Sequence, residues 1–146
     1  MPIKVQREFA PPAAAAHNAT SQQFCAWVGD AAHAWDARTG RYVSRHRYGA
    51  GREVSAACFD LPRARRAFLG TERGEILTVN YVTGEVMGTT QPHAGEVGGL
   101  AFCPLTRCVI SRGADGTLRV FRDDRSHLAP LRCVENAHRG AAITCM

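Results

Sequence analysis

The stretch Glu53-Val54-Ser55-Ala56-Ala57-Cys58-Phe59 recurs 43 residues later as Glu96-Val97-Gly98-Gly99-Leu100-Ala101-Phe102. The segments around the two copies also recur in step, so that Trp35, Val79 and Phe121 fall in one column at intervals of 44 and 42 residues. Self-similarity at a fixed interval of this size is typical of repeat proteins, in which each unit is one supersecondary structure. The chain is therefore predicted to consist of consecutive units of this length.

Apolar and polar residues alternate with a period of two between turn residues, which predicts β-strands along most of the chain. We expect strands at residues 3–9, 24–29, 32–36, 41–47, 53–59, 66–72, 75–81, 85–90, 96–102, 107–112, 117–122, 130–135 and 141–146. The alanine-rich stretch 11–18 breaks this alternation, and we predict a lengthened loop there, with a short helix as the alternative. Four strands in a repeat of about 40–45 residues favour a β-propeller blade over a helical solenoid, so the expected class is all-β.

Several short motifs follow one another in the order of a WD repeat. In chain order they are His93, a first strand at 97–102, Pro104, a second strand at 109–111, the Asp115-Gly116 turn and a third strand at 118–121. The Trp35-Asp36 pair, followed by Thr39-Gly40, matches a third strand and its following turn. The chain from Phe24 onward therefore resembles a WD-repeat β-propeller of four-stranded antiparallel blades, and is loosely similar to large ciliary and flagellar WD-repeat proteins.

This resemblance divides the chain into units. Residues 1–47 are expected to form an irregular or incomplete blade with an Ala/Pro-rich loop, residues 48–91 and 92–136 two further blades, and residues 137–146 the first strand of another. Propellers close with about four to eight blades, so about three blades are not enough to close a ring. We therefore expect a fragment or segment of a larger propeller, whose remaining blades bind in cis or in trans.

The resemblance also implies a structural hydrogen-bond network. In WD-repeat proteins a histidine, a Ser or Thr on the second strand, a turn aspartate and a tryptophan can bind one another within a blade. His93, Ser111 and Asp115 match three of these positions, whereas the fourth holds a phenylalanine, which has no N–H to donate. Trp35 and Asp36 of the first unit are the other residues that we assign to structural networks of this kind.

Composition limits the other possibilities. The 146 residues carry a net charge of +5, which favours acidic partners, and the basic residues are spread over all repeats. No apolar run approaches the length of a membrane span and no signal-peptide core follows Met1, so an intracellular, cytoplasmic setting is expected, with a cilium or flagellum as the alternative. The six cysteines include no Cys-x-x-Cys pair, which indicates free thiols.

No motif points to catalysis, a cofactor or a metal. The Gly-rich stretches Gly49-Ala50-Gly51 and Gly98-Gly99 lack the Lys-Ser/Thr sequel and the helix of a phosphate-binding loop. Cys103 and Cys108 flank a loop between strands, with no histidine at zinc-finger spacing. His93 with its serine and aspartate is a structural set in this register, so we expect no enzyme.

What remains is binding through loops. The loops before first strands and those between second and third strands share one face of a propeller, and their candidate partner-binding residues are Tyr48, Arg52, Arg73, His93 and Arg112. Arg and Tyr are enriched at interface hot spots, so we expect a non-catalytic protein–protein interaction scaffold with a protein or acidic peptide partner. The alternative is an RNA- or nucleic-acid-associated propeller that uses its arginines. The basic stretch 63–66 has no interleaved aromatics for base stacking, and we interpret it as a solvated loop or strand edge.

Overall fold

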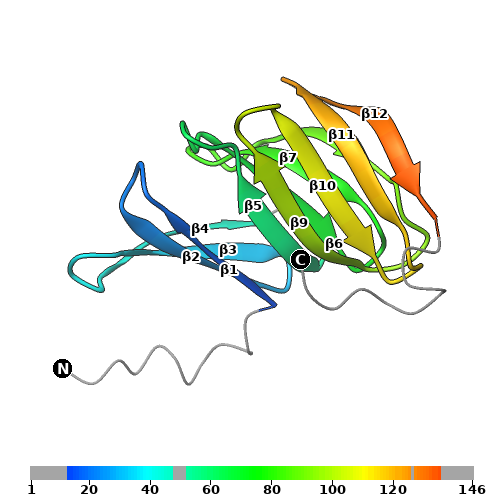
Figure 1. Cartoon of the computed structure of the whole chain (residues 1–146). Helices are drawn as coiled ribbons and strands as arrows, with labels where there is room; N and C mark the ends of the chain where they lie inside the picture. Colours follow the sequence, from blue (N-terminus) through cyan, green and yellow to red (C-terminus); the bar gives the residue numbers. More distant parts are fainter. Residues whose placement is uncertain (1–12, 48–51, 126, 136–146) are drawn as a thin grey trace.

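The computed structural model of the chain describes residues 13–47, 52–125 and 127–135 (Figure 1). Within these residues the protein is all-β, with twelve strands in three antiparallel sheets of four, which confirms the predicted class. The first sheet contains β1 (Ala14–Asn18), β2 (Gln23–Val28), β3 (Ala31–Asp36) and β4 (Tyr42–Arg47). The second contains β5 (Val54–Phe59), β6 (Arg66–Thr71), β7 (Ile76–Asn80) and β8 (Val86–Thr90). The third contains β9 (Val97–Cys103), β10 (Cys108–Gly113), β11 (Leu118–Asp124) and β12 (His127–Val134).

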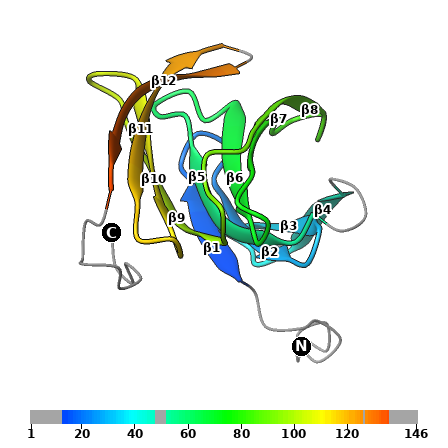
Figure 2. The same ribbon diagram turned by 90° about the vertical axis from the view of Figure 1, so that its right-hand side faces the viewer.

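The first strand of each sheet contacts the first strand of the next. β1 lies against β5 and β5 lies against β9, while the later strands of each sheet fan outward (Figure 2). Strands follow one another in each sheet in sequence order, so neighbouring strands of a sheet are antiparallel and consecutive in the chain. The three described sheets do not close a ring.

Apolar side chains fill the two spaces between neighbouring sheets. Trp27, Leu69 and Val79 belong to a buried cluster between the first and second sheets. A second cluster, with Phe68, Ile76, Val97, Val109 and Phe121, lies between the second and third sheets. Burial of this apolar surface is the main force that holds the sheets together, because each sheet alone would expose both faces to water.

The repeat register found in the sequence is confirmed by the strand pairing. Trp35, Val79 and Phe121 each pair with the second strand of their own sheet and each directly follow a β-bulge in the pairing with the fourth strand. The turn after the third strand also repeats. The side chains of Asp36 and Asn80 accept hydrogen bonds from backbone N–H groups two and three residues ahead, at 2.8–3.1 Å.

The loop predicted within residues 11–18 is wrong, because Ala14–Asn18 form strand β1. Alanine has a low β-propensity, so local preference did not reveal this strand. Pairing with β2 and packing against the first cluster decide its structure, and Ala14 and Ala16 supply small side chains opposite Trp27 and Cys25. The described part of the first unit is thus a full four-stranded sheet. The strands expected at 3–9 and 141–146, and the unit 137–146, lie outside the described residues.

Gly70 offers a test of the contact between the second and third sheets. A Cβ at this position would lie 2.6 Å from Cβ of Val97, so Gly70→Ala must push β6 and β9 apart. Overpacking of this kind costs about 1–3 kcal/mol. We expect the free energy of unfolding, measured with urea, to fall by that amount.

Gly95→Ala is the matched control, since its Cβ would meet only the Ala114 Cβ at 3.5 Å, which is ordinary contact. This control should change stability by less than about 0.5 kcal/mol. Equal losses in the two variants would show that the Gly70 contact does not limit the packing.

Candidate partner-binding surfaces

The antiparallel order places the connections at two opposite ends of the sheets. We call one end the loop face; it carries the segments before β5 and β9 and the β6–β7 and β10–β11 turns. We call the other the arginine end; it carries the β5–β6, β9–β10 and β11–β12 turns, which lie at the top of Figure 1. Four of the partner-binding residues predicted from the sequence, Arg52, Arg73, His93 and Arg112, belong to the loop face.

The loop face of the third sheet is held by a buried histidine. His93 Nε2 lies 2.8 Å from Ser111 Oγ, and its Nδ1 lies 3.2 Å from the Asp115 carboxylate. Thr117, which the sequence analysis did not include, donates its hydroxyl to Asp115 at 2.7 Å and also lies 2.9 Å from Nδ1. Gly113 leaves the space for the ring, because a Cβ there would lie 2.3 Å from His93 Nδ1.

Ionisation of the carboxylate sets the direction of these hydrogen bonds. Burial alone would raise the pKa of Asp115, but the hydroxyl and N–H of Thr117, the N–H of Ala94 and nearby His93 together lower it to about 2. An ionised carboxylate only accepts, so His93 Nδ1 carries the proton and Nε2 accepts the hydrogen bond from Ser111. Burial lowers the pKa of His93, although Asp115 opposes this shift, so the ring is neutral at pH 7.

This geometry corrects one predicted binding residue. The His93 side chain is fully buried and Ser111 is also buried, so neither can contact a partner or act as a nucleophile toward a substrate in solvent. The network needs that burial, because water would compete for each of its hydrogen bonds.

Trp35 and Asp36 lie in the first sheet, apart from His93. Trp35 packs edge-on against Tyr42, with ring centroids 5.7 Å apart, and next to His33. Asp36 caps the β3–β4 turn, where the N–H groups of Thr39 and Arg38 lower its pKa. These residues stabilise their own sheet and its turn, and they belong to a different blade from the His93 network.

The remaining loop-face residues do not form a cluster of free cations. Tyr48 lies outside the described residues, Arg73 is exposed and Arg52 is half-buried. Arg112 lies across Gly98 and Gly99, where a Cβ would come within 2.8 Å of its guanidinium group.

Carboxylates lie among these arginines. Glu72 has a raised pKa because it shares a hydrogen bond with Glu53, whose charge also acts on it, and because Glu96 is nearby. All three glutamates are exposed. The loop face therefore presents both signs of charge, which is a poorer match for an acidic partner than the sequence suggested.

The arginine end is organised around one ion-pair network. Arg66, on β6, donates from Nε to Asp60 at 3.0 Å and from Nη1 to Asp123 at 2.8 Å. Asp123 belongs to β11, and its side chain is only 1% exposed. Its hydrogen bond and charge raise the pKa of Arg66 despite partial burial. Arg107, from the β9–β10 turn, binds the same carboxylate at 2.9 Å.

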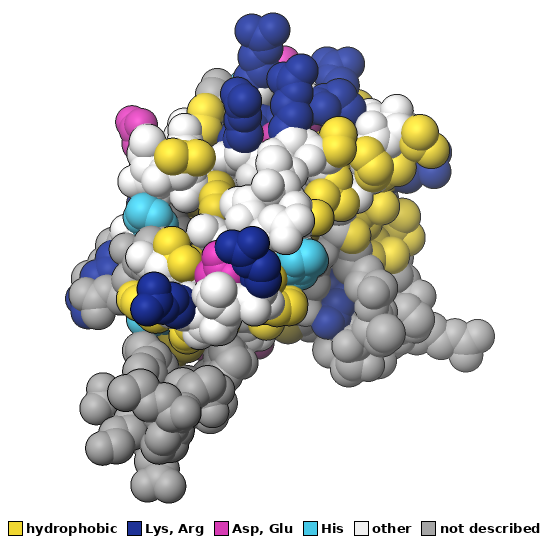
Figure 3. All heavy atoms as spheres, turned by 90° about the vertical axis from the view of Figure 1, so that its left-hand side faces the viewer, with side chains coloured by type: hydrophobic (Ala, Val, Ile, Leu, Met, Phe, Trp, Pro, Cys, Tyr) yellow, Lys and Arg dark blue, Asp and Glu magenta, His cyan; other side chains and the backbone are white. Residues whose placement is uncertain are grey.

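Around this network runs a groove of about 850 Å³. The residues that line it are Asp60, Pro62, Arg63, Arg65, Arg66, Asn80, Met87, Arg107, Asp123, Asp124 and Arg125. Figure 3 shows basic side chains gathered at the top of the molecule, with a few acidic side chains among them. We call this surface the arginine groove. Residues 63–66 were predicted to be a solvated loop or strand edge; Arg107 and Arg125 lie far from them in the sequence, and only the fold brings them to the same groove.

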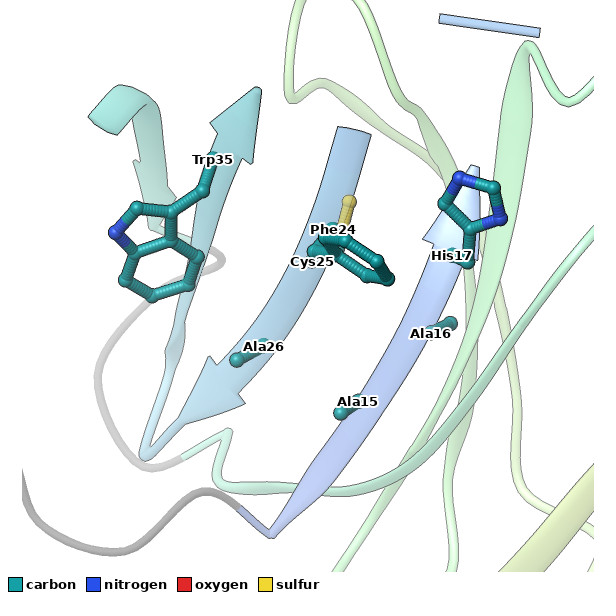
Figure 4. Close-up of a pocket in the computed structure, with 7 residues that line it drawn as sticks. All are labelled: Ala15, Ala16, His17, Phe24, Cys25, Ala26 and Trp35. Atoms are coloured by element: carbon teal, nitrogen blue, oxygen red, sulfur yellow. The ribbon is translucent and has the colours of Figure 1, made fainter. Parts of the chain in front are cut away.

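A second, apolar hollow of about 330 Å³ lies on the first sheet (Figure 4). Phe24, at 52% exposed, lies between Trp35 and His17 on neighbouring strands. The pairs Ala67–Val79 and Val109–Phe121 hold the positions of Phe24 and Trp35 in the next two sheets, and each of those pairs packs against the sheet before it. The hollow is therefore the equivalent packing face of the first sheet, and none of the other described sheets covers it.

The described residues show two further absences. No three His, Cys, Asp or Glu side chains among them lie close enough together to hold a metal ion. None of the segments described forms a helix that could cross a membrane.

No protein-family model matches the sequence, and comparison with curated proteins finds no match. The fold does have counterparts among solved structures. Sqt1 from Chaetomium thermophilum, in a crystal structure bound to the N-terminus of the ribosomal protein L10, matches 92% of this chain with a TM-score of 0.78 at 19% identity. A crystal structure of the RRP9 WD40 repeats matches 89% with a TM-score of 0.76 at 16% identity.

These likenesses show the fold of the chain. Its three sheets are consecutive blades of a WD40-type β-propeller, as the sequence motifs predicted. The chain covers only 39% of that Sqt1 chain and 40% of the RRP9 chain, so it spans less than half the length of either. The loose ciliary and flagellar resemblance receives no support from these structures.

The His93 network predicts a position-specific loss of stability. Asp115→Ala removes the acceptor for the Thr117 and Ala94 N–H groups and for the buried His93 ring. Loss of one partner of a buried polar group costs about 1–3 kcal/mol, and urea unfolding should show a loss in this range. Arg73→Ala, at the exposed β6–β7 turn of the preceding blade, is the control and should be nearly neutral. Equal losses at the two positions would contradict the role given to Asp115.

The lowered pKa of His93 predicts a pH dependence. The unfolded chain binds a proton at this histidine near pH 6.5, whereas the folded chain resists protonation. The contribution of His93 to the free energy of unfolding is therefore complete above about pH 6.5. It is lost as the pH falls through the pKa of His93 in the folded chain. In His93→Gln the free energy of unfolding should vary less between about pH 7 and pH 5 than in the unmodified chain. Parallel pH curves for the two proteins would refute this.

Proposed function

We propose that this chain is a non-catalytic scaffold segment of a larger intracellular propeller, and that it binds an acidic polypeptide in the arginine groove. The observation that carries the proposal is the convergence of arginines from three different turns on one groove. Support for a protein partner comes from the fold, since the Sqt1 structure with the same fold holds the N-terminus of a ribosomal protein.

The charges in the groove divide into two groups. Arg66 and Arg107 are engaged with Asp60 and Asp123, so their charges are largely balanced within the protein. Arg63, Arg65 and Arg125 are exposed, and the remaining groove carboxylate, Asp124, lies 3.3 Å from His127. The exposed arginines therefore supply the excess positive charge of the groove.

These exposed arginines can bind the carboxylates of an acidic peptide. A guanidinium group offers a fork of donors that matches a carboxylate in bidentate geometry. Proteins that bind single-stranded nucleic acid without sequence preference add aromatic side chains on which bases stack. The lining of the groove contains no aromatic residue. An acidic peptide is thus favoured over RNA, which remains the alternative.

The open face of the first sheet takes a different partner. Because Phe24 and Trp35 repeat the positions by which the second and third blades pack on their predecessors, we infer that a further propeller blade, in cis or in trans, covers this face. Its apolar lining matches the side chains that fill the two existing blade contacts.

The test of the arginine groove is a binding titration with a fluorescein-labelled hexaglutamate peptide, followed by anisotropy. Arg63→Glu/Arg65→Glu should weaken binding about tenfold, because it replaces two attractions with two repulsions. Arg38→Glu/Arg41→Glu, an equal charge change at exposed positions of the β3–β4 turn, is the matched control and should bind nearly as the unmodified chain does.

Two other outcomes would overturn the assignment. If Arg52→Glu/Arg73→Glu weakens binding and the groove variant does not, the partner binds the loop face predicted from the sequence. If an oligouridine RNA binds with a steep salt dependence while the peptide does not bind, the nucleic-acid alternative replaces the proposal.

A further inference from the structure

Two cysteines face each other across the β9–β10 hairpin. Cys103 is the last residue of β9, Cys108 is the first of β10, and the two are direct partners in the antiparallel ladder. The Cα atoms of such partners lie about 4.5–5.5 Å apart. Disulfides form at Cα separations of about 4.4–6.8 Å. The backbone therefore already holds these two residues within bonding range.

In the second blade the two side chains at the same position do meet. Asp60 and Arg66 occupy it in the second blade, where they form an ion pair at 3.0 Å. Asn18 and Gln23 occupy it in the first blade. In the third blade two thiols take the place of the ion pair, so a covalent bond there would join strands that the second blade joins by charge.

The turn activates one of the two thiols. The Thr106 hydroxyl, followed by the N–H groups of Thr106 and Leu105, lowers the pKa of Cys103. Cys108 donates its S–H to the Thr106 carbonyl at 3.5 Å, and both cysteines are partly exposed. A thiol with a lowered pKa and access to solvent is oxidised more readily than a buried thiol, because more of it is present as the thiolate.

Cys25 and Cys58 differ in this respect. Burial raises the pKa of Cys25, and burial together with the charge of Asp60 raises that of Cys58 to about 12. Neither Cys25 nor Cys58 has a cysteine as its partner in the strand pairing. Cys133 is exposed and pairs with Arg119. Among the described cysteines, the β9–β10 pair alone combines register and accessibility.

We propose that Cys103 and Cys108 are a reversible thiol–disulfide site that a peroxide oxidises. The Cys103 thiolate attacks one oxygen of hydrogen peroxide, the O–O bond breaks, and a sulfenic acid and hydroxide form. The Cys108 sulfur then attacks the Cys103 sulfur and displaces the second hydroxide, which leaves as water with the Cys108 proton. In total two thiols lose two hydrogens, and one peroxide is reduced to two waters.

Peptide mapping tests this directly on the full chain. Trypsin cleaves after Arg107, so Cys103 and Cys108 fall in separate peptides, residues 74–107 and 108–112. After treatment with hydrogen peroxide, unfolding and alkylation of the remaining thiols, these two peptides should appear as one linked species, two hydrogens lighter than their sum. Dithiothreitol should separate them again.

Variants identify the two partners. Cys108→Ser should abolish the linked species and leave Cys103 as a sulfenic or sulfinic acid, whereas Cys58→Ser, the matched control, should retain the link. If the linked species forms in a dilute solution of the unmodified chain and no disulfide-joined dimer is found, the bond lies within one chain. The proposal is overturned if peroxide leaves both thiols open to alkylation, or if it joins either one mainly to Cys133 or to a second chain.

Discussion

Arg66 is the residue on which the arginine end of the molecule depends. It donates to Asp60 of its own blade and to Asp123 of the next, two carboxylates that are almost fully buried. Loss of one partner from a buried ion pair costs about 3–5 kcal/mol, because the remaining charge stays desolvated. The shared Asp123 also orients Arg107, whose guanidinium lies 5.8 Å from the centre of the Phe102 ring. One network thus fixes the angle between two blades and the wall of the groove.

The three blades share one backbone arrangement but carry different side chains at equivalent positions. At the cross-strand position near the arginine end, the first blade has an amide pair, the second an ion pair and the third the thiols of Cys103 and Cys108. Toward the loop face, the third blade has the His93 network, whereas in the second blade buried Leu69 holds the position of Ser111. Because neighbouring blades supply the apolar packing, side chains at the ends of the strands can vary without loss of the fold.

The arrangement of the strands was predictable because it depends on the alternation of apolar and polar residues and on the regular repeat interval. Both can be read from a single sequence. Strand β1 was missed because its alanines carry no strand preference, and pairing with β2 decides its structure. The arginine groove was missed because Arg66 and Asp123 meet across 57 residues of sequence. His93 was assigned two roles that exclude each other, since a neutral, hydrogen-bonded ring must be buried and a binding residue must be exposed.

The two ends of the blades differ in how closely their side chains are packed, and this difference supports the proposal that a partner binds in the arginine groove. At the loop face there is no room for a side chain at two glycines: a Cβ on Gly74, whose φ is +87°, would lie 2.1 Å from the His93 carbonyl oxygen, and a Cβ on Gly113 would lie 2.3 Å from the His93 ring. Few side chains fit there, and those present bear both signs of charge. At the arginine end, Arg63 and Arg65 extend from a turn into solvent above a fixed ion pair. Long side chains on a rigid base can adapt to a partner while the blade contact beneath them stays unchanged, which is what a scaffold requires.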